Sequence, residues 1–367
     1  MLGVRSRPTV GLLAALTLIV AACGNGDAEL EEMPEDADVD GEDAAGTEAA
    51  EDESVGEDEQ ADLEHVQVMM FPGQSYRIPA LIAEQEGFFA ERGIEISIVD
   101  QPGGVTGTQG LAATESDVGY ITPVTAAQGW QAGEDVTFFC GSIDVTEQSL
   151  FAPADTDLPA IQDGASAEEV FEALSGTTIG VQTPVGSGLQ LFFEAAVEAE
   201  GVTDLELINT GVDLPVVVAS LEGGDVDLAQ TTPALTQLLQ HTGDAKELIY
   251  LPDHAEHYEL YGSAILGDGE WLENNPETAA AYCDAIEEAL DFILDDANAD
   301  AVDELVVEDI GVEPEVAAMV RERSFPEFST EIPEDVLNDT FEFNIEIGVL
   351  DPEPAPTYDN MVVEVRE

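Results

Sequence analysis

Positively charged side chains are almost missing from this chain of 367 residues. It has 8 Lys and Arg against 80 Asp and Glu, which gives a formal net charge of −72 at pH 7. A surface this acidic repels nucleic acid and anionic membranes, so we exclude both as partners. Such a chain also repels itself unless salt screens it, and the Debye length falls to about 3 Å near 1 M ionic strength. We interpret the composition as adaptation to a saline medium. The alternative, that acidity only keeps a secreted protein soluble, accounts for the sign of the charge but hardly for its size.

Long apolar runs are also scarce, and the run from Val10 to Ala22 is too short to span a bilayer comfortably. Arg5 and Arg7 precede it and small residues lead up to Cys23, which is the layout of a secretion signal. The sequence Val-Ala-Ala-Cys ending at Cys23 resembles a bacterial lipoprotein box. This resemblance implies cleavage before Cys23, a lipid on that cysteine, and a mature protein held at the outer face of the cytoplasmic membrane. An ordinary secretion signal with an incidental cysteine is the alternative.

Large apolar residues are nearly absent from segment 24–63, which is mostly Ala, Gly, Asp and Glu. Such a segment cannot bury enough surface to offset the entropy lost on ordering. We therefore predict an acidic, disordered linker between the signal, residues 1–23, and the folded part.

One pattern is present twice. An Asp is followed five positions later by Thr and Pro, in DVGYITP from Asp117 and in DLAQTTP from Asp227. Each copy predicts a buried strand that turns into a helix, with Thr as N-cap and Pro as the first helical residue. Ligands of open α/β sheets bind beyond the carboxyl ends of the strands. The two copies therefore predict two lobes that face each other across one cleft.

Strands and helices alternate through most of the chain, which predicts an α/β fold with mainly parallel sheets. We assign residues 64–150 to lobe I and 151–261 to lobe II. From Glu270 the pattern is mostly helical, and these helices need a sheet to cover. We expect the chain to return to lobe I through a strand near 261–266, so that 262–350 completes lobe I and 351–367 forms a C-terminal tail. The lobes are then joined by two crossings, which form the hinge.

Residues at the predicted strand ends are the candidates for ligand binding. The candidates are Tyr76, Arg77, Gly103, Gly104, Thr122, Pro123, Thr183, Gly186, Ser187, Gly188, Asp213 and Thr232. Tyr76 would stack on a planar ligand or cover an apolar one, unless it only packs at the rim. The backbone N–H groups at Ser187 suit a carboxylate or sulfonate, although such a Gly-rich turn is also common as plain architecture. Arg77 would pair with an anionic ligand or with a neighbouring carboxylate.

Three stretches carry a resemblance to a known family: GQSYRIPALIAEQEGFFAERGIEISIVDQPGG from Gly73, the turn from Leu111 to Asp117, and LEGGDVDLAQTTPA. They resemble the nitrate/sulfonate/taurine-type and thiamine-pyrimidine-type (SsuA/THI5-like) substrate-binding proteins of ABC importers. The resemblance implies a type II periplasmic-binding fold with a two-crossing hinge. It also implies capture of a small molecule by lobe closure and delivery to a membrane permease with a cytoplasmic ATPase. Thr231 and Thr232 replace the family's usual Glu or Trp, so the resemblance does not specify the ligand.

Several alternatives stay open. The ligand is an organic sulfonate or carboxylate, a nitrogenous compound, or a pyrimidine-like thiamine precursor, and a sensory or partner-binding lipoprotein would use the same fold. A relative in this fold group is an enzyme that needs a lysine in the cleft, but Lys246 is the only lysine and leads into a predicted strand. We therefore predict a monomeric protein that is not an enzyme and has no cofactor. Metal ligands could come from His254 and His257 together with Glu256 and Glu259. The pattern favours a polar turn over a metal site, so we predict no metal.

The cysteines complete the predictions. With Cys23 acylated, Cys140 and Cys283 remain as an even pair in an oxidising compartment, both in lobe I. We predict a disulfide between them, with two buried thiols as the alternative.

Overall fold

The structure of this protein is a computed structural model that describes residues 63–100, 108–182, 188–211, 213–254 and 260–366. The predicted signal and linker, with the lipidation residue Cys23, lie outside these ranges. The site predictions Gly103, Gly104, Thr183, Gly186 and Ser187 also lie outside them.

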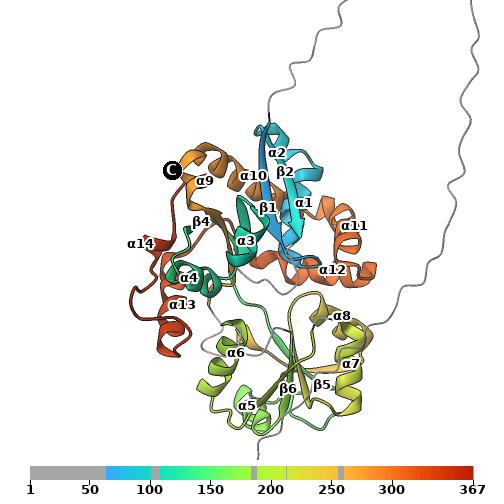
Figure 1. Cartoon of the computed structure of the whole chain (residues 1–367). Coiled ribbons are helices and arrows are strands. Elements are labelled where there is room, and N and C mark those ends of the chain that lie inside the picture. Colours follow the sequence, from blue (N-terminus) through green and yellow to red (C-terminus); the bar gives the residue numbers. More distant parts are fainter. Residues whose placement is uncertain (1–62, 101–107, 183–187, 212, 255–259, 367) are drawn as a thin grey trace, which may run out of the picture. The chain divides into compact units, whose positions relative to one another are not determined.

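Lobe I is built on a five-stranded sheet with the order β2-β1-β3-β10-β4 (Figure 1). β1 pairs in parallel with β2 and β3, and β10 pairs antiparallel with β3 and β4. The strands are β1 (Glu64–Met70), β2 (Ile94–Asp100), β3 (Val118–Ile121), β4 (Val136–Ile143) and β10 (Ser263–Asp268).

Lobe II repeats this arrangement in a sheet with the order β7-β6-β8-β5-β9. β6 pairs in parallel with β7 and β8, and β5 pairs antiparallel with β8 and β9. The strands are β5 (Ser149–Pro153), β6 (Thr178–Val181), β7 (Glu206–Asn209), β8 (Leu228–Thr231) and β9 (Ala245–Tyr250).

In each sheet four strands run one way and one runs against them, which confirms two mainly parallel sheets. The exceptions, β5 and β10, are the first strands after the chain crosses from the other lobe. A chain that leaves one sheet at the carboxyl end of a strand enters the next sheet from that same side, so it must run opposite to its neighbours. The predicted lobe boundary at residue 150 is wrong in detail, because β5 already begins at Ser149 in the second sheet. The turn that separates the lobes lies earlier, at residues 144–148.

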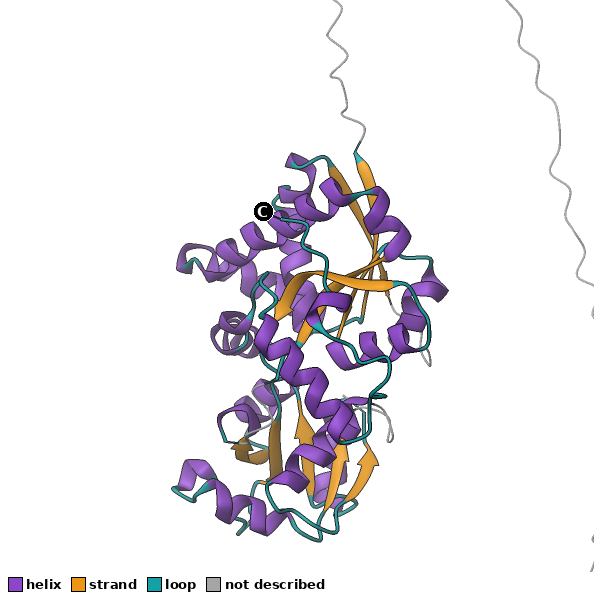
Figure 2. Cartoon of the chain, turned by 90° about the vertical axis from the view of Figure 1, so that its left-hand side faces the viewer, coloured by secondary structure: helices purple, strands orange, loops and turns teal. Residues whose placement is uncertain are grey.

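Helices cover both sheets (Figure 2). Lobe I carries α1 (Ile78–Gln85), α2 (Phe88–Glu91), α3 (Thr108–Thr114), α4 (Pro123–Gln131), α9 (Gly269–Asn274), α10 (Pro276–Leu294), α11 (Ala299–Ile310), α12 (Pro314–Arg323), α13 (Glu334–Glu346) and α14 (Tyr358–Met361). Lobe II carries α5 (Ala167–Leu174), α6 (Gly188–Ala199), α7 (Leu214–Gly223) and α8 (Leu235–Thr242). No described helix is both long enough and apolar enough to cross a membrane.

The C-terminal helices return to lobe I and complete its core. α10 packs on α1, and the Cys140–Cys283 disulfide joins β4 to α10. The segment that we predicted as a tail also packs here, because Met361 is fully buried and the Val363 N–H donates to the Phe138 carbonyl at 2.8 Å. Residues 351–366 are therefore part of lobe I rather than an appendage to it.

The repeated Asp plays the same structural role in both lobes. The Asp117 carboxylate accepts the Gln67 N–H at 2.8 Å, and the Asp227 carboxylate accepts the Thr178 N–H at 2.9 Å. Each Asp thereby fixes the start of one parallel strand against its neighbour. The pattern identifies the internal symmetry of the fold, and its Asp residues serve strand pairing.

The two Thr-Pro steps differ. α4 begins at Pro123 with Thr122 as N-cap, as predicted, but the Thr122 hydroxyl donates to the Thr125 hydroxyl at 2.9 Å rather than capping the helix N–H groups. In lobe II the prediction of a helix from Pro233 is wrong, because α8 begins only at Leu235. Ala234 precedes it with φ 71°, a strained backbone conformation for a residue with a Cβ. Ala234 also packs with the hydrophobic cluster of lobe I, so contact with the other lobe accompanies this local deviation.

Candidate functional site

The carboxyl ends of the parallel strands face the opposite lobe in both sheets. β4 ends at Ile143 and β5 begins at Ser149 in the other sheet, while β9 ends at Tyr250 and β10 begins at Ser263. Both crossings are thus short, and they bring the two sets of strand ends together at the hinge. Of the described site predictions, Tyr76 and Thr122 follow strands of lobe I, and Asp213 and Thr232 follow strands of lobe II.

Tyr76 lies in a short helical turn after β1 and is partly exposed. Its ring stacks on Tyr120 with centroids 5.7 Å apart and planes 11° apart, and its hydroxyl accepts the Phe71 N–H at 3.2 Å. The Tyr120 hydroxyl in turn lies 3.2 Å from that of Tyr282. Burial raises the pKa of Tyr76 above its usual value, so the phenol stays neutral. Tyr76 is therefore an aromatic surface at the end of β1 with a fixed orientation.

Lobe II contributes neutral polar groups at its strand ends. Gln182 follows β6 and Gln230 lies in β8, and the Gln182 N–H donates to Gln230 Oε1 at 3.5 Å. Gln182 Oε1 is itself buried and has no hydrogen-bond partner among the described residues. The hydroxyls of Thr231 and Thr236 lie 2.8 Å apart. The sequence did not single out either glutamine, although Gln182 directly follows a predicted strand.

Gly188 is the first residue of α6 and Asp213 is the N-cap position of α7. Asp213 is exposed, and its carbonyl accepts the N–H groups of Val216 and Val217 at 3.0 Å. Its side chain makes no cap hydrogen bond. The carboxylate therefore stands at a strand end of lobe II as a solvated negative charge.

Arg77 does not present a free positive charge to a ligand. Its guanidinium donates to Asp309 through Nε at 3.0 Å and Nη2 at 3.2 Å, and to Asp100 through Nη1 at 2.8 Å. Burial opposes the charged form, but the hydrogen bonds to Asp100 and Asp309 outweigh it and raise the pKa of Arg77. Of the two roles that the sequence left open for Arg77, the structure has the ion pair with neighbouring carboxylates. Asp309 is 232 positions away in sequence.

A small cavity lies where the two crossings meet. It measures about 20 Å³ and is lined by Thr122, Pro123, Val124, Thr146, Phe192, Leu260, Tyr261, Gly262, Thr340 and Asn344. One water molecule needs about 10–15 Å³ measured in this way, so the cavity holds about one. A larger hollow of about 410 Å³ lies at the other edge of the lobe I sheet, beside Asp117 and Asp135, which precede β3 and β4. Its position at the amino ends of these strands sets it apart from the predicted site.

The lobes also contact each other outside the crossings. Phe192 of α6 meets Phe343 of α13 edge to face, with ring centroids 5.9 Å apart. Arg323, at the end of α12, lies 4.4 Å from the ring centroid of Tyr250 and 3.7 Å from the Glu247 carboxylate. The hinge is therefore flanked by an aromatic contact and by a cation held against lobe II.

Two carboxyl groups of the first crossing have raised pKa values. Glu147 is 7% exposed, and burial raises its pKa to about 7, against the opposing effects of Ser324 and Arg323. Burial also raises the pKa of Asp144 to about 6, and the nearby charges of Glu327 and Glu331 add to this shift. Carboxyl groups that titrate near neutrality are uncommon, and here they lie in the segment that links the lobes.

Two further features bear on the chemistry of the strand ends: the position of the only lysine and the arrangement of candidate metal ligands. Lys246 pairs with Asp163 at 2.6 Å and lies near the amino end of β9, away from the crossing. Within the described ranges no group of three or more His, Cys, Asp or Glu side chains is arranged to hold a metal ion. His257, Glu256 and Glu259 lie outside those ranges.

Comparisons with known proteins agree with the fold. The sequence model of the NMT1/THI5-like family matches residues 74–299, whereas no curated protein matches significantly. The periplasmic aliphatic sulphonate binding protein SsuA from Escherichia coli is 15% identical, covers 82% of this chain and 92% of its own, and superposes with a TM-score of 0.65.

Two further solved structures are similar. The alkanesulfonate-binding protein SsuA from Xanthomonas axonopodis pv. citri, bound to MOPS, is 15% identical, with coverage of 78% and 94% and a TM-score of 0.60. The desulfurization enzyme DSZB is 17% identical, with coverage of 82% and 96% and a TM-score of 0.60. At these identities the neighbours show the type II periplasmic-binding fold alone. The family model covers well over half of the chain, and the protein therefore belongs to the NMT1/THI5-like family.

Proposed function

We propose that this protein is the extracytoplasmic solute-binding component of an ABC importer. It captures a small organic molecule between its two lobes and delivers it to a membrane permease driven by a cytoplasmic ATPase. The observation that carries the proposal is the pair of matching sheets whose strand ends meet at a hinge of two short crossings. Membership in the NMT1/THI5-like family and the likeness to the SsuA structures support it.

Lipid anchoring belongs to the same proposal. A lipid on Cys23 and the acidic segment 24–63 would tether the lobes near a permease while leaving them free to move. Cys23→Ala should release the protein from the membrane fraction into the medium and abolish its labelling by a fatty-acid probe. Release without any loss of labelling would contradict a lipid on Cys23.

Solute binding is tested directly by thermal unfolding of the mature protein in molar salt. The panel contains organic sulfonates, carboxylates, nitrate, pyrimidines and flavins. A ligand at 100 times its dissociation constant should raise the free energy of unfolding by about 2.7 kcal/mol. A stabilising ligand recovered unchanged after long incubation supports a binding protein, and its conversion would support an enzyme like DSZB. Absence of any response from folded, ligand-free protein would favour a sensory or partner-binding lipoprotein.

A further inference from the structure

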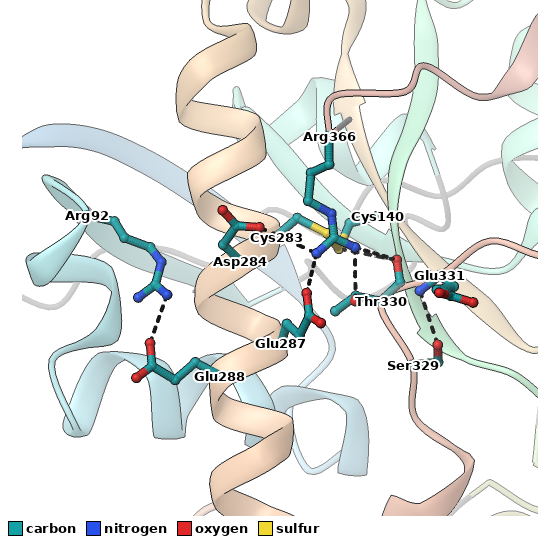
Figure 3. Close-up of polar contacts among 10 residues, drawn as sticks. All are labelled: Arg92, Cys140, Cys283, Asp284, Glu287, Glu288, Ser329, Thr330, Glu331 and Arg366. Atoms are coloured by element: carbon teal, nitrogen blue, oxygen red, sulfur yellow. Dashed lines mark hydrogen bonds and ion pairs between the residues drawn. A yellow bond between two sulfur atoms is a disulfide. The ribbon is translucent and has the colours of Figure 1, made fainter.

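Every Lys and Arg outside the predicted signal is paired with a carboxylate. Two of the eight Lys and Arg residues, Arg5 and Arg7, belong to the predicted signal. Each of the other six lies within 2.5 to 3.7 Å of an Asp or Glu oxygen. Figure 3 shows two of them, Arg92 with Glu288 and Arg366 with Glu287. The six are Arg77, Arg92, Lys246, Arg321, Arg323 and Arg366.

Arg77, which follows β1, is the basic residue beside the strand ends of lobe I. It contacts two carboxylates, so the group of Arg77, Asp100 and Asp309 carries a formal charge of −1 rather than +1. Asp309, in α11, forms a bidentate ion pair with the guanidinium, and the Asp309 side chain is 15% exposed. Asp100 is the last residue of β2, at the edge where ligands bind in this fold, and its side chain is 63% exposed. An anion approaching this edge therefore meets the exposed Asp100 carboxylate.

In lobe II, Arg323 lies over the ring of Tyr250 at the end of β9, and its charge is paired with Glu247 at 3.7 Å. The further groups at the strand ends discussed above are neutral or negative. Tyr76 offers the face of a neutral ring, and such faces attract cations and planar molecules. Gln182 Oε1 is a buried acceptor with no partner among the described residues, so it is suited to an N–H donor. Asp213 adds a solvated carboxylate in lobe II. The sequences of segments 101–107 and 183–187, which lie outside the described residues, contain no Lys or Arg.

We propose, on the basis of the solute-binding function above, that the site selects planar nitrogen compounds without negative charge, and that Asp100 enforces this selection by neutralising Arg77. The ligand is neutral or positively charged and donates an N–H group toward Gln182. This ligand class differs from the sulfonates bound by the SsuA proteins of similar fold.

The test uses matched sets of aromatic compounds that share one ring system and differ in one group: an amidinium, a carboxamide or a sulfonate. One-ring and two-ring scaffolds are titrated into the mature protein by calorimetry at a fixed molar salt concentration. We expect the amidinium or carboxamide member to bind at least about tenfold more tightly than the sulfonate, or about 1.4 kcal/mol. A sulfonate that binds as tightly as its neutral counterpart would overturn the charge selection but leave solute binding intact. Lack of binding by every member and by the broader solute panel would overturn both.

Asp100→Asn tests the role assigned to Asp100. The substitution frees Arg77 on its exposed side, while Asp309 still holds it from α11. The affinity for sulfonates should rise at least about tenfold, and that for amidinium compounds should fall. Asp303→Asn is the matched control, since it releases Arg321, which pairs with α11 within lobe I, and it should leave both affinities unchanged. An Asp100→Asn protein that is folded and keeps the wild-type order of affinities would refute the role of Asp100.

Discussion

Glu147 should make the stability of this protein fall as the pH rises through neutrality. Its carboxyl group is 7% exposed in the first crossing, and burial raises its pKa from 4.5 to about 7 in the folded state. The folded protein thus binds this proton more tightly than the unfolded chain. The stabilisation is complete below the unfolded pKa of 4.5 and is lost as the pH rises through the folded pKa of about 7. The shift corresponds to a free energy on the order of 3 kcal/mol.

Glu147→Gln replaces the titrating group by a neutral isostere. The variant should match the wild type at about pH 4 and exceed its free energy of unfolding by about 3 kcal/mol near pH 8.5. The free energy of unfolding of both proteins is measured by urea unfolding across this pH range at a constant, molar NaCl concentration. Subtracting the wild-type value from that of the variant removes the contributions of the other carboxylates, which both proteins share. Glu270→Gln, which removes an exposed carboxylate of α9, is the control and should change the free energy of unfolding far less than Glu147→Gln does.

A stability difference between Glu147→Gln and the wild type that stays flat with pH would refute the reasoning. In that case Glu147 would titrate as in the unfolded chain, and Arg323 or Ser324 would compensate for its burial in full. A difference of opposite sign, with the variant less stable near pH 8.5, would mean that the ionised carboxylate is the stabilising form.

Three further predictions concern stability and the aromatic surface. Replacing both Cys140 and Cys283 by Ala opens a loop with a sequence separation of 143, which should lower the free energy of unfolding by about 5 kcal/mol in the chain-entropy model; a loss below about 1 kcal/mol in urea unfolding would contradict this. Tyr76→Phe should preserve solute affinity and the stacking on Tyr120, whereas Tyr76→Ala should weaken binding of planar ligands by about tenfold or more in calorimetry; equal affinities for all three proteins would remove Tyr76 from the site. Because the net charge is −72, the thermal midpoint should rise steadily from dilute buffer to molar NaCl, and a midpoint highest in dilute buffer would contradict adaptation to salt.

The sequence alone determined the features that depend on neighbouring residues and on composition. The pattern shared by Asp117 and Asp227 predicted two strand-to-helix steps and hence two similar lobes. This prediction was possible because the periodicity of apolar residues in a strand or helix is a property of consecutive residues. The predicted fold class is confirmed by the two mixed sheets and by the similar solved structures. The unusual scarcity of Lys and Arg was also visible from the start.

Only the tertiary structure decided which groups meet. The sequence left two roles open for Arg77, an anionic ligand or a neighbouring carboxylate, and the fold decided between them by placing Asp309 of α11 against it, 232 positions away. Nothing in the sequence distinguishes Glu147 from the rest of the 80 acidic residues. Its burial depends on how the two lobes pack around the crossing. The sequence pattern predicted that α8 begins at Pro233, but the helix begins at Leu235. The residue between them, Ala234, packs with the hydrophobic cluster of lobe I. Charge pairing and burial depend on contacts between distant segments, and the periodicity of a sequence carries no information about those contacts.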